Sequence, residues 1–509
     1  MRSQIATALR RVPPAAAAAL LGFVALVGWG LSSPVGSSPD DDFHLASIWC
    51  GLGERDGLCG PGTGDTSREV NRDLVVTSVC YAYDPEKSAG CQGDGFGEDP
   101  ATRVVTERGN FAGLYPPVFY AVTSLFASQN LDVSTILVRG FNALLFIGLV
   151  GATYALLPRH RRNALIASAA LTVVPLGMFL IPSTNPSSWA IASSATLWIS
   201  LLGYFESTGP RKWGLAGIAA LSTVIGAGAR ADAAIYSVVA IGVACFLAFR
   251  ADKRFWRDTL LAVGLVVVAV AFYLGASQSG AATTGLTGTT PTSAAQWIGL
   301  FIANIVNVPD LWVGVFGHWG LGWLDTAMPA AVWVGSFGVV VAVIASQLRS
   351  RDRRGVIAIL GLVALLFVFP AYILTQSQAL VGGYVQPRYI MPLIIILVGV
   401  AVLSGPRSGA LADRRVLGVG AAILALANCA ALYINIRRYV TGLDTLSLNL
   451  DAQAEWWWSA GPSPLAVWII GSLAFAGCVA FLIRVVSTSQ TQAGRSISDL
   501  ESAEVRGSG

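Results

Sequence analysis

The chain has few charged residues, few histidines and no cysteine pair with the spacing of a zinc site. Asp, Glu, Lys and Arg make up 12% of its 509 residues, and the net charge is +4. So little charge excludes a soluble enzyme, and so small a net charge excludes a nucleic-acid-binding surface. Without a Cys-x-x-Cys pair, no zinc is expected. With 54% hydrophobic residues and a mean hydropathy of +0.62, the composition predicts an all-α polytopic membrane protein in a lipid bilayer.

Apolar segments long enough to cross a bilayer, which takes about 17 to 25 residues, recur along the chain. We expect twelve transmembrane helices, at about 13–31, 131–157, 164–181, 187–205, 212–229, 232–249, 259–276, 328–347, 355–374, 388–404, 415–434 and 464–483. They form one transmembrane domain over residues 1–485, and residues 486–509 form a flexible cytoplasmic tail. The first segment also resembles a cleaved signal peptide, but its length favours a retained helix.

Basic residues near the ends of the spans predict the orientation, because Lys and Arg collect on the cytoplasmic side of a membrane. Most of the 33 Lys and Arg residues fall on the side that holds both termini, so both termini are expected in the cytoplasm. Three exterior segments, at about 32–130, 277–327 and 435–463, are longer than connections between helices need to be. Loops of this length usually carry function.

Four of the seven cysteines lie in the first exterior segment, where an oxidising compartment favours disulfides. Four cysteines allow three connectivities. We favour the two local pairs, Cys50 with Cys59 and Cys80 with Cys91.

Three acids and a histidine directly follow the first span, at Asp40-Asp41-Asp42-Phe43-His44. The spacing of apolar residues from 41 to 52 predicts a short helix that lies on the membrane and presents Asp40, Asp41 and His44 near the headgroups. Helix capping by the acids is the plainer alternative. The same three residues would hold a divalent cation, Mg or Mn, if one is bound, although ordinary hydrogen-bonded histidines are the simpler account.

Six short motifs follow one another between residue 34 and about residue 400. They are Pro39-Asp40-Asp41 with His44, Tyr115-Pro116-Pro117 with Tyr120, Arg139 with Asn142, Asn185-Pro186, Gly322-Trp323-Leu324-Asp325-Thr326 with Pro329, and Arg388-Tyr389 with Pro392. Their order resembles the bacterial membrane family called domain of unknown function 2142, which in turn looks like the GT-C superfamily of glycosyltransferases. Two positions depart from the family pattern: Asp41 replaces a usual Glu, and Pro387 replaces a usual Gly.

The resemblance implies a GT-C-like fold and an inverting enzyme that moves a sugar from a polyprenyl-phosphate donor to a cell-envelope glycan or lipid acceptor. It implies a bacterial cytoplasmic (inner) membrane protein that acts on the exterior face in cell-wall polysaccharide biosynthesis. Such a transfer needs a base for the acceptor hydroxyl and cations for the departing phosphate. We expect Asp41, or as second choice Asp40, to be the base, and Arg388 beside Tyr389 to bind the phosphate.

Further polar residues are expected to bind substrate, and each also has a structural interpretation. They are His44, Tyr115, Arg139, Asn185, His318, Trp323 and Asp325. Arg139 lies inside a span and therefore needs a partner or a water-filled cavity. Arg230 with Asp232 is typical of an ion pair as much as of a site, and the Trp triplet at 456–458 is more typical of a membrane-interface anchor than of sugar stacking.

Two other classes of function stay open from the sequence. One is a transporter or flippase of lipid-linked sugars, and the other is a noncatalytic envelope scaffold. Transporters are commonly built from inverted repeats, and no clear internal repeat is visible here, which favours the enzyme.

Overall fold

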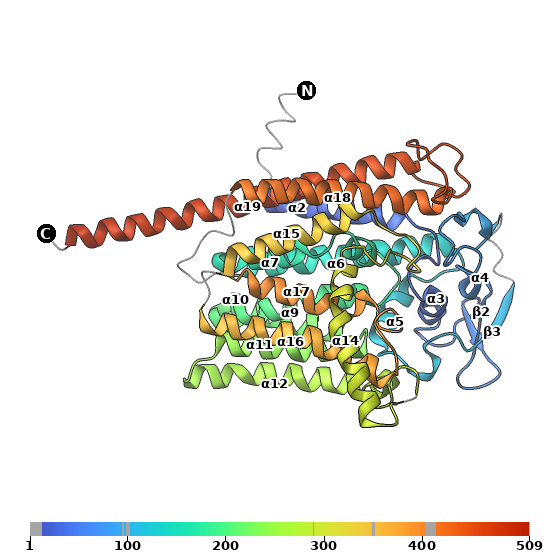
Figure 1. Cartoon of the computed structure of the whole chain (residues 1–509), viewed down its shortest axis with the longest axis horizontal. Coiled ribbons are helices and arrows are strands. Elements are labelled where there is room, and N and C mark those ends of the chain that lie inside the picture. The colour runs from blue at the N-terminus through green and yellow to red at the C-terminus, as the bar shows by residue number, and fades with distance from the viewer. Residues whose placement is uncertain are drawn as a thin grey trace.

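The computed structural model describes residues 13–93, 96–97, 102–288, 290–348, 352–403 and 414–507. Most of the long helices run along the horizontal axis of Figure 1, and the loops, short helices and strands of residues 32–130 gather at one end of the bundle. Both disulfides lie in this part of the chain, so we call it the disulfide end. The connection between the last two helices reaches the same end of the bundle (Figure 1).

The bundle consists of long helices connected by shorter ones. The long helices are α2 (Pro14–Leu31), α6 (Leu131–Leu156), α9 (Ser187–Glu206), α10 (Gly209–Ala227), α11 (Ala231–Ala248), α12 (Lys253–Leu274), α14 (Ala294–Val315), α15 (Ala330–Leu348), α16 (Arg353–Gln376), α17 (Pro387–Ala401), α18 (Arg414–Val440) and α19 (Pro464–Gly507). The shorter ones are α3 (Asp41–Trp49), α4 (Asp73–Val76), α5 (Val118–Thr123), α7 (Arg159–Leu171), α8 (Leu176–Leu180) and α13 (Ala281–Thr284). Four 3-10 turns complete the helical part: η1 (Ala89–Gln92), η2 (Asn110–Ala112), η3 (Ser124–Phe126) and η4 (Ser277–Gly280).

The prediction of twelve spans is not confirmed. Within the described residues, nine helices are long and apolar enough to cross a membrane: α2, α6, α11, α12, α14, α15, α16, α18 and α19. All but α14 coincide with predicted spans. The predicted span 164–181 is divided, because α7 ends at Leu171 and α8 begins only at Leu176. The predicted span 388–404 is the short helix α17, of 15 residues.

Helix α14 lies inside the segment 277–327, which was predicted to be a loop between spans. This helix has 22 residues and contains Pro309, and it is one of the helices that could cross a membrane. Polar residues such as Asn304, together with the proline, lowered the apparent hydropathy in the sequence. Tertiary contacts satisfy the amide, since Asn304 Nδ2 donates to the carbonyl of Ala379 at 3.0 Å.

Helix α9 forms the centre of the bundle. It packs against α6, α10, α11 and α17, and its residues from Ser187 to Phe205 are all buried. Its small polar side chains let neighbouring helices approach closely, and they bond to backbone carbonyls or to each other. Thr196 Oγ1, for example, lies 2.8 Å from Ser222 Oγ on α10. With these serines and threonines, α9 is not among the nine described helices that are long and apolar enough to cross a membrane.

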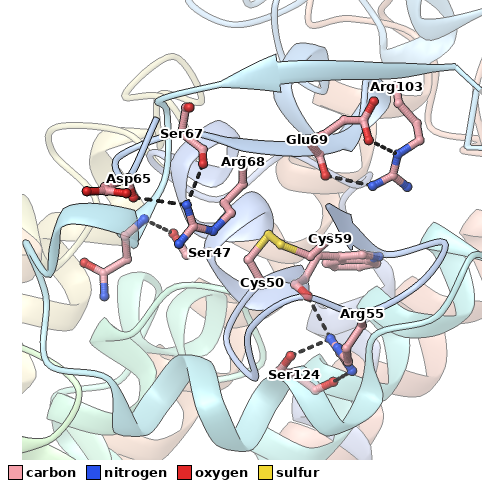
Figure 2. Close-up of a disulfide and its surroundings, with 12 residues drawn as sticks. Ser47, Cys50, Arg55, Cys59, Asp65, Ser67, Arg68, Glu69, Arg103 and Ser124 are labelled. Atoms are coloured by element: carbon pink, nitrogen blue, oxygen red, sulfur yellow. Dashed lines mark hydrogen bonds and ion pairs between the residues drawn. A yellow bond between two sulfur atoms is a disulfide. The ribbon is translucent and has the colours of Figure 1, made fainter. Parts of the chain in front are cut away.

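A three-stranded antiparallel sheet and two disulfides order the first long connection. The strands β1 (Cys59–Pro61), β2 (Arg68–Asn71) and β3 (Arg103–Thr106) pair in chain order. Both favoured disulfides are present, Cys50–Cys59 and Cys80–Cys91. Figure 2 shows Arg55 beside the first of them, where its guanidinium donates to Trp49 O at 2.7 Å and to Ser124 Oγ at 2.6 Å.

The short helix predicted from residue 41 is present as α3, but the prediction that it exposes Asp41 and His44 at its surface is wrong. All of its residues except Asp42 are buried, among them Asp41 and His44. A helix with one polar face would leave that face in contact with headgroups and water, whereas α3 is packed on all sides by α4, α5 and η2. Asp41 and His44 therefore lie inside the protein at the disulfide end, whereas Asp40 and Asp42 are partly exposed.

Candidate functional site

The loop that precedes α3, residues 32–40, is held by bonds from several distant parts of the chain. Arg139 on α6 donates from Nη1 to Gly30 O at 2.8 Å and to Ser33 O at 2.6 Å, and from Nη2 to Pro34 O at 2.6 Å. Asn185 Nδ2 donates to Pro39 O at 2.8 Å, and Trp323 Nε1 donates to Gly36 O at 2.9 Å. Tyr81 donates its hydroxyl proton to Val35 O at 3.1 Å. Three residues predicted to bind substrate, Arg139, Asn185 and Trp323, thus position this loop.

Asp41 is a buried anchor for the same loop. Its side chain is inaccessible to solvent, and its oxygens accept from Thr184 Oγ1 at 2.6 Å and from the backbone N–H of Ser38 at 3.0 Å. Burial raises the pKa of Asp41 to about 6, against the opposing effects of the Thr184 bond and the charge of Arg139. The residue expected to be the first-choice base therefore has no free path to a substrate.

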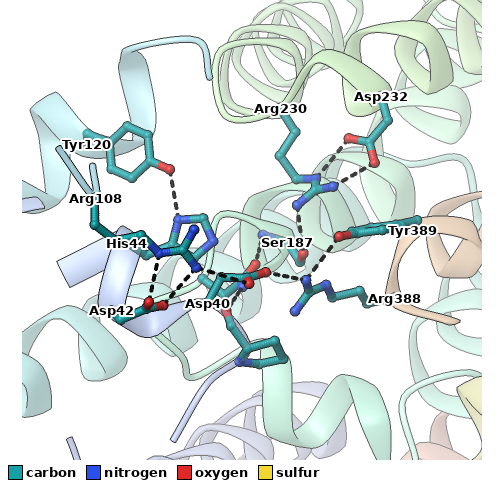
Figure 3. Close-up of polar contacts among 12 residues, drawn as sticks. Asp40, Asp42, His44, Arg108, Tyr120, Ser187, Arg230, Asp232, Arg388 and Tyr389 are labelled. Carbon is teal, nitrogen blue, oxygen red and sulfur yellow. Dashed lines mark hydrogen bonds and ion pairs between the residues drawn. The ribbon is translucent and has the colours of Figure 1, made fainter. Parts of the chain in front are cut away.

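Asp40 is the acid that reaches the site. Its backbone is left-handed, with φ at 58°, a conformation that Asp tolerates better than most residues. Its side chain is 38% exposed, and its carboxylate lies 2.6 Å from Arg388 Nη2 and 3.7 Å from Arg108 (Figure 3). Burial works to raise the pKa of Asp40, but the charge of Arg388, its hydrogen bond to Asp40 and the neighbouring charges together more than offset burial, so this pKa lies below its usual value.

Arg388 has unused hydrogen-bonding capacity at the start of α17. Pro387 opens that helix, and the Arg388 side chain is only 3% exposed. Nη2 donates to Asp40 and to the Tyr389 hydroxyl at 3.0 Å. Nε and Nη1 are buried and have no partner among the described residues. Because buried charged donors are costly to leave unpaired, about 1–3 kcal/mol or more each, this guanidinium is suited to an incoming anion.

A second arginine faces the same tyrosine. The guanidinium carbon of Arg230 lies 4.8 Å from the centre of the Tyr389 ring, and that of Arg388 lies 5.0 Å from it. Arg230 is held by Asp232 through two bonds of 2.8 Å, as Figure 3 shows. The interpretation of Arg230 and Asp232 as an ion pair is confirmed, and the pair also belongs to the site.

His44 and two tyrosines form the other side of the site. His44 Nδ1 lies 2.8 Å from the Tyr120 hydroxyl, and the His44 ring packs edge-on against Tyr115 at 5.5 Å. His44 Nε2 is buried and has no partner among the described residues. Burial lowers the pKa of His44 to about 3, although the Asp40 charge opposes this shift. The imidazole is therefore neutral at physiological pH.

An apolar cavity of about 240 Å³ begins at Arg230, Asp232 and Tyr389. Its remaining walls come from α11, α12, α13 and α16 and include Tyr236, Tyr273, Phe369 and Ile373. A lining that combines charged groups with mostly apolar side chains matches a ligand with an anionic head and a hydrocarbon chain.

The sequence of the chain matches the profile of one protein family over residues 23–397. That family, domain of unknown function 2142, is described as a predicted membrane protein. The chain belongs to this family. Comparison with curated proteins and with solved structures gave no match.

The matched region of this predicted membrane protein family includes every residue of the Asp40–Arg388 site. It includes Asp325, which the structure places elsewhere: the carboxylate is buried and pairs with Arg438 on α18 at 2.9 Å, and it accepts from the backbone N–H of Tyr83 at 3.1 Å. His318 lies apart from His44, in contact with Asp310 and Trp333. Both residues were predicted to bind substrate, and neither reaches the site.

No metal cluster is present in the described part of this family member. No three His, Cys, Asp or Glu side chains there converge to hold an ion. Asp40, Asp41 and His44, the predicted ligand set, turn instead toward Arg388, Thr184 and Tyr120, respectively. Backbone geometry separates the two acids, because the left-handed turn at Asp40 directs its side chain away from that of Asp41.

Sequence reasoning missed two contributors to the site, Arg108 and Thr184. Arg108 pairs with Asp42 at 2.7 Å and approaches Asp40 from the loop after β3. Thr184 occupies the turn between α8 and α9 and binds Asp41. Neither belongs to a recognisable motif. Only the polar residues between 183 and 188, clustered inside an apolar stretch, gave a signal that could have directed attention to Thr184.

Proposed function

We propose that the chain is a membrane glycosyltransferase that moves a sugar from a polyprenyl-phosphate donor to a glycan or lipid acceptor of the cell envelope. The observation that carries this proposal is the pair of unpartnered buried donors on Arg388, beside the accessible carboxylate of Asp40. A cation with vacant donors next to a base is the minimum that displacement of a phosphate by a hydroxyl requires.

The donor fits the site in two parts. Its phosphate accepts from Nε and Nη1 of Arg388 and is further stabilised by the nearby charge of Arg230. Its polyprenyl chain follows the apolar cavity, in which aromatic and aliphatic side chains such as Phe369 and Ile373 replace lipid. The site is therefore complementary to the amphipathic character of the donor.

The chemical step is a single inverting displacement. The acceptor oxygen attacks the anomeric carbon of the sugar and forms the new glycosidic bond. The bond between that carbon and the phosphate oxygen breaks, and its electron pair leaves on the phosphate, which Arg388 stabilises. Asp40 takes the proton of the acceptor hydroxyl. No covalent enzyme intermediate forms, so one carboxylate is sufficient.

Asp40 replaces Asp41 as the proposed base, because a general base must first lie within hydrogen-bond reach of the acceptor hydroxyl, whatever its pKa. Asp41 has a more basic carboxylate, but it is inaccessible and both of its oxygens are bonded. Asp40 is accessible, and its ion pair with Arg388 makes it a weak base while the site is empty. When donor phosphate binds Arg388, the arginine charge is shared with a second anion and the pKa of Asp40 rises. The base therefore becomes competent only when the donor is in place.

The test uses the full chain purified into nanodiscs, with a panel of labelled polyprenyl-phosphate sugars and envelope glycan acceptors. Asp40→Asn is expected to lower kcat by about 10²- to 10⁴-fold, the usual contribution of a general base. Arg388→Ala is expected to lower kcat and raise KM together. Asp56→Asn is the control, since Asp56 is an exposed acid of the first long connection and its loss is expected to change the rate at most a few-fold.

Two outcomes would overturn this proposal. Transfer that continues unchanged in both the Asp40 and Arg388 variants would show that the reaction takes place elsewhere. If no donor is consumed while lipid-linked sugar crosses reconstituted vesicles, the chain is a transporter.

A further inference from the structure

A second cavity at the disulfide end encloses about 620 Å³ and shares no lining residue with the apolar cavity. Its walls come from η1, the first turn of α6, the 32–40 loop and the connection between α18 and α19. Its volume lies within the range of small-molecule sites, roughly 300–1,000 Å³. We call it the tryptophan groove, because Trp456, Trp457 and Trp458 all line it.

The three indoles form one aromatic wall. The ring of Trp456 lies 5.6 Å from that of Trp457 and 5.4 Å from that of Trp458. Trp457 and Trp458 are fixed by their N–H groups, which donate to Pro462 O and Leu31 O at 2.8 Å. The indole N–H of Trp456 has no partner among the residues that the structure describes. Indole rings offer flat apolar faces, and these match the C–H-rich faces of sugar rings.

Hydrogen-bonding groups line the rest of the groove and carry no positive charge. They include the carboxylates of Asp132 and Glu455 and the side-chain amides of Gln92, Gln129 and Asn130. None of the described lining residues is Lys or Arg. The two carboxylates accept from hydroxyl donors and repel phosphate, and the amides both accept and donate. The lining therefore favours a neutral polyol and is opposite in character to the Arg388 site.

The groove is rigid before any ligand binds. The Cys80–Cys91 disulfide fixes η1. The backbone of Glu455 packs directly on Gly90, because a Cβ added to Gly90 would lie only 2.7 Å from the carbonyl oxygen of Glu455. Ser88 donates its hydroxyl proton to the Glu455 carboxylate. The backbone N–H of Glu455 donates to Val440 O at the end of α18, at 2.9 Å. A preformed site of this kind loses little entropy on binding.

We infer that the tryptophan groove binds a neutral oligosaccharide, with its sugar rings against Trp456 and Trp457 and its hydroxyls bonded to Glu455, Asp132 and the amides. The 32–40 loop connects the groove to the other site, because Val35 lines the groove and Asp40 ends the loop. The assignment of this oligosaccharide as the acceptor rests on the proposed glycosyl transfer. Binding itself does not depend on it.

The experiment measures equilibrium binding without donor, by calorimetry and tryptophan fluorescence, on the full chain in nanodiscs. The probes are neutral hexose and pentose oligosaccharides, a phosphorylated oligosaccharide and a basic peptide. The neutral oligosaccharides are expected to bind, and Trp456→Ala and Trp457→Ala are expected to weaken that binding by about tenfold or more. Trp456→Phe retains an aromatic face and is expected to keep part of the affinity, which separates a loss of stacking from a loss of folding.

Trp297→Ala is the matched control. Trp297 also lies at a helix end, where it stacks on Phe301 within α14, and it does not line the groove. The inference is overturned if no neutral oligosaccharide binds at millimolar concentration, if Trp297→Ala weakens binding as much as Trp456→Ala, or if only the peptide or the phosphorylated sugar binds. Oligosaccharide binding without any transfer refutes the proposed enzyme and leaves the groove assignment intact. Transfer without oligosaccharide binding refutes the groove assignment and leaves the proposed enzyme intact.

Discussion

Asp325 provides the sharpest test of whether a motif residue acts in chemistry or in folding. Its carboxylate is 2% exposed and pairs at 2.9 Å with Arg438, whose side chain is fully buried. Removing one member of a buried ion pair leaves an uncompensated charge, and this typically costs about 3–5 kcal/mol. Asp325→Asn keeps an oxygen for the Tyr83 N–H, so the substitution removes the charge alone. We expect a large fall in Tm and in the yield of folded protein.

The assay is thermal unfolding in nanodiscs, followed by intrinsic fluorescence, together with kcat of the protein that remains folded. Arg438→Gln combined with Asp325→Asn removes both charges and is expected to recover part of the lost Tm. Asp56→Asn is the control, because Asp56 is an exposed acid of the first long connection and its loss is expected to leave Tm unchanged. The reasoning is refuted if Asp325→Asn unfolds at the wild-type temperature and yet has lost glycosyl transfer, since Asp325 would then act on substrate.

Three further predictions concern the 32–40 loop, the titrating residues and the disulfides. Arg139→Met removes the bonds to Gly30 O, Ser33 O and Pro34 O, so we expect a lower Tm and at least tenfold slower transfer, measured as kcat on folded protein. His44 has a pKa lowered by burial to about 3, so the unfolded chain binds its proton first and stability falls as pH drops from about 6.5 toward 3. His44→Gln is therefore expected to reduce the loss of Tm between about pH 6.5 and 3, and an unchanged pH profile would exclude a buried neutral imidazole. Asp41, with its raised pKa of about 6, stabilises the folded state as pH falls, and it does so equally in the wild type and in His44→Gln. Replacing Cys80 and Cys91 by Ser removes a disulfide between residues 11 positions apart, and we expect this to lower the free energy of unfolding by about 2–4 kcal/mol. The same change is expected to weaken oligosaccharide binding in the tryptophan groove, which calorimetry would measure.

Hydropathy identified most of the long helices, because a bilayer demands uninterrupted apolar length whatever the rest of the fold does. It missed α14, where burial in protein replaces burial in lipid. This helix carries Pro309 and Asn304, which contacts with α16 and the following loop accommodate. It found α9 at 187–205, although the serines and threonines of α9 leave it outside the nine described helices that are apolar enough to cross a membrane. A scale of transfer from water to lipid has no information about such contacts.

The sequence by itself determined the membrane class and the family, favoured the two local disulfides over the other connectivities, and drew attention to an acidic loop and to Arg388 far along the chain. Composition, spacing along the chain and redox chemistry suffice for these, because each depends on residues near one another in sequence or on the solvent they prefer. Only the tertiary structure decided which of two adjacent acids reaches the site. That choice depends on the left-handed turn at Asp40, the distant Thr184 that captures Asp41 and the position of Arg388, which lies 348 residues from Asp40 in the chain and forms an ion pair with it.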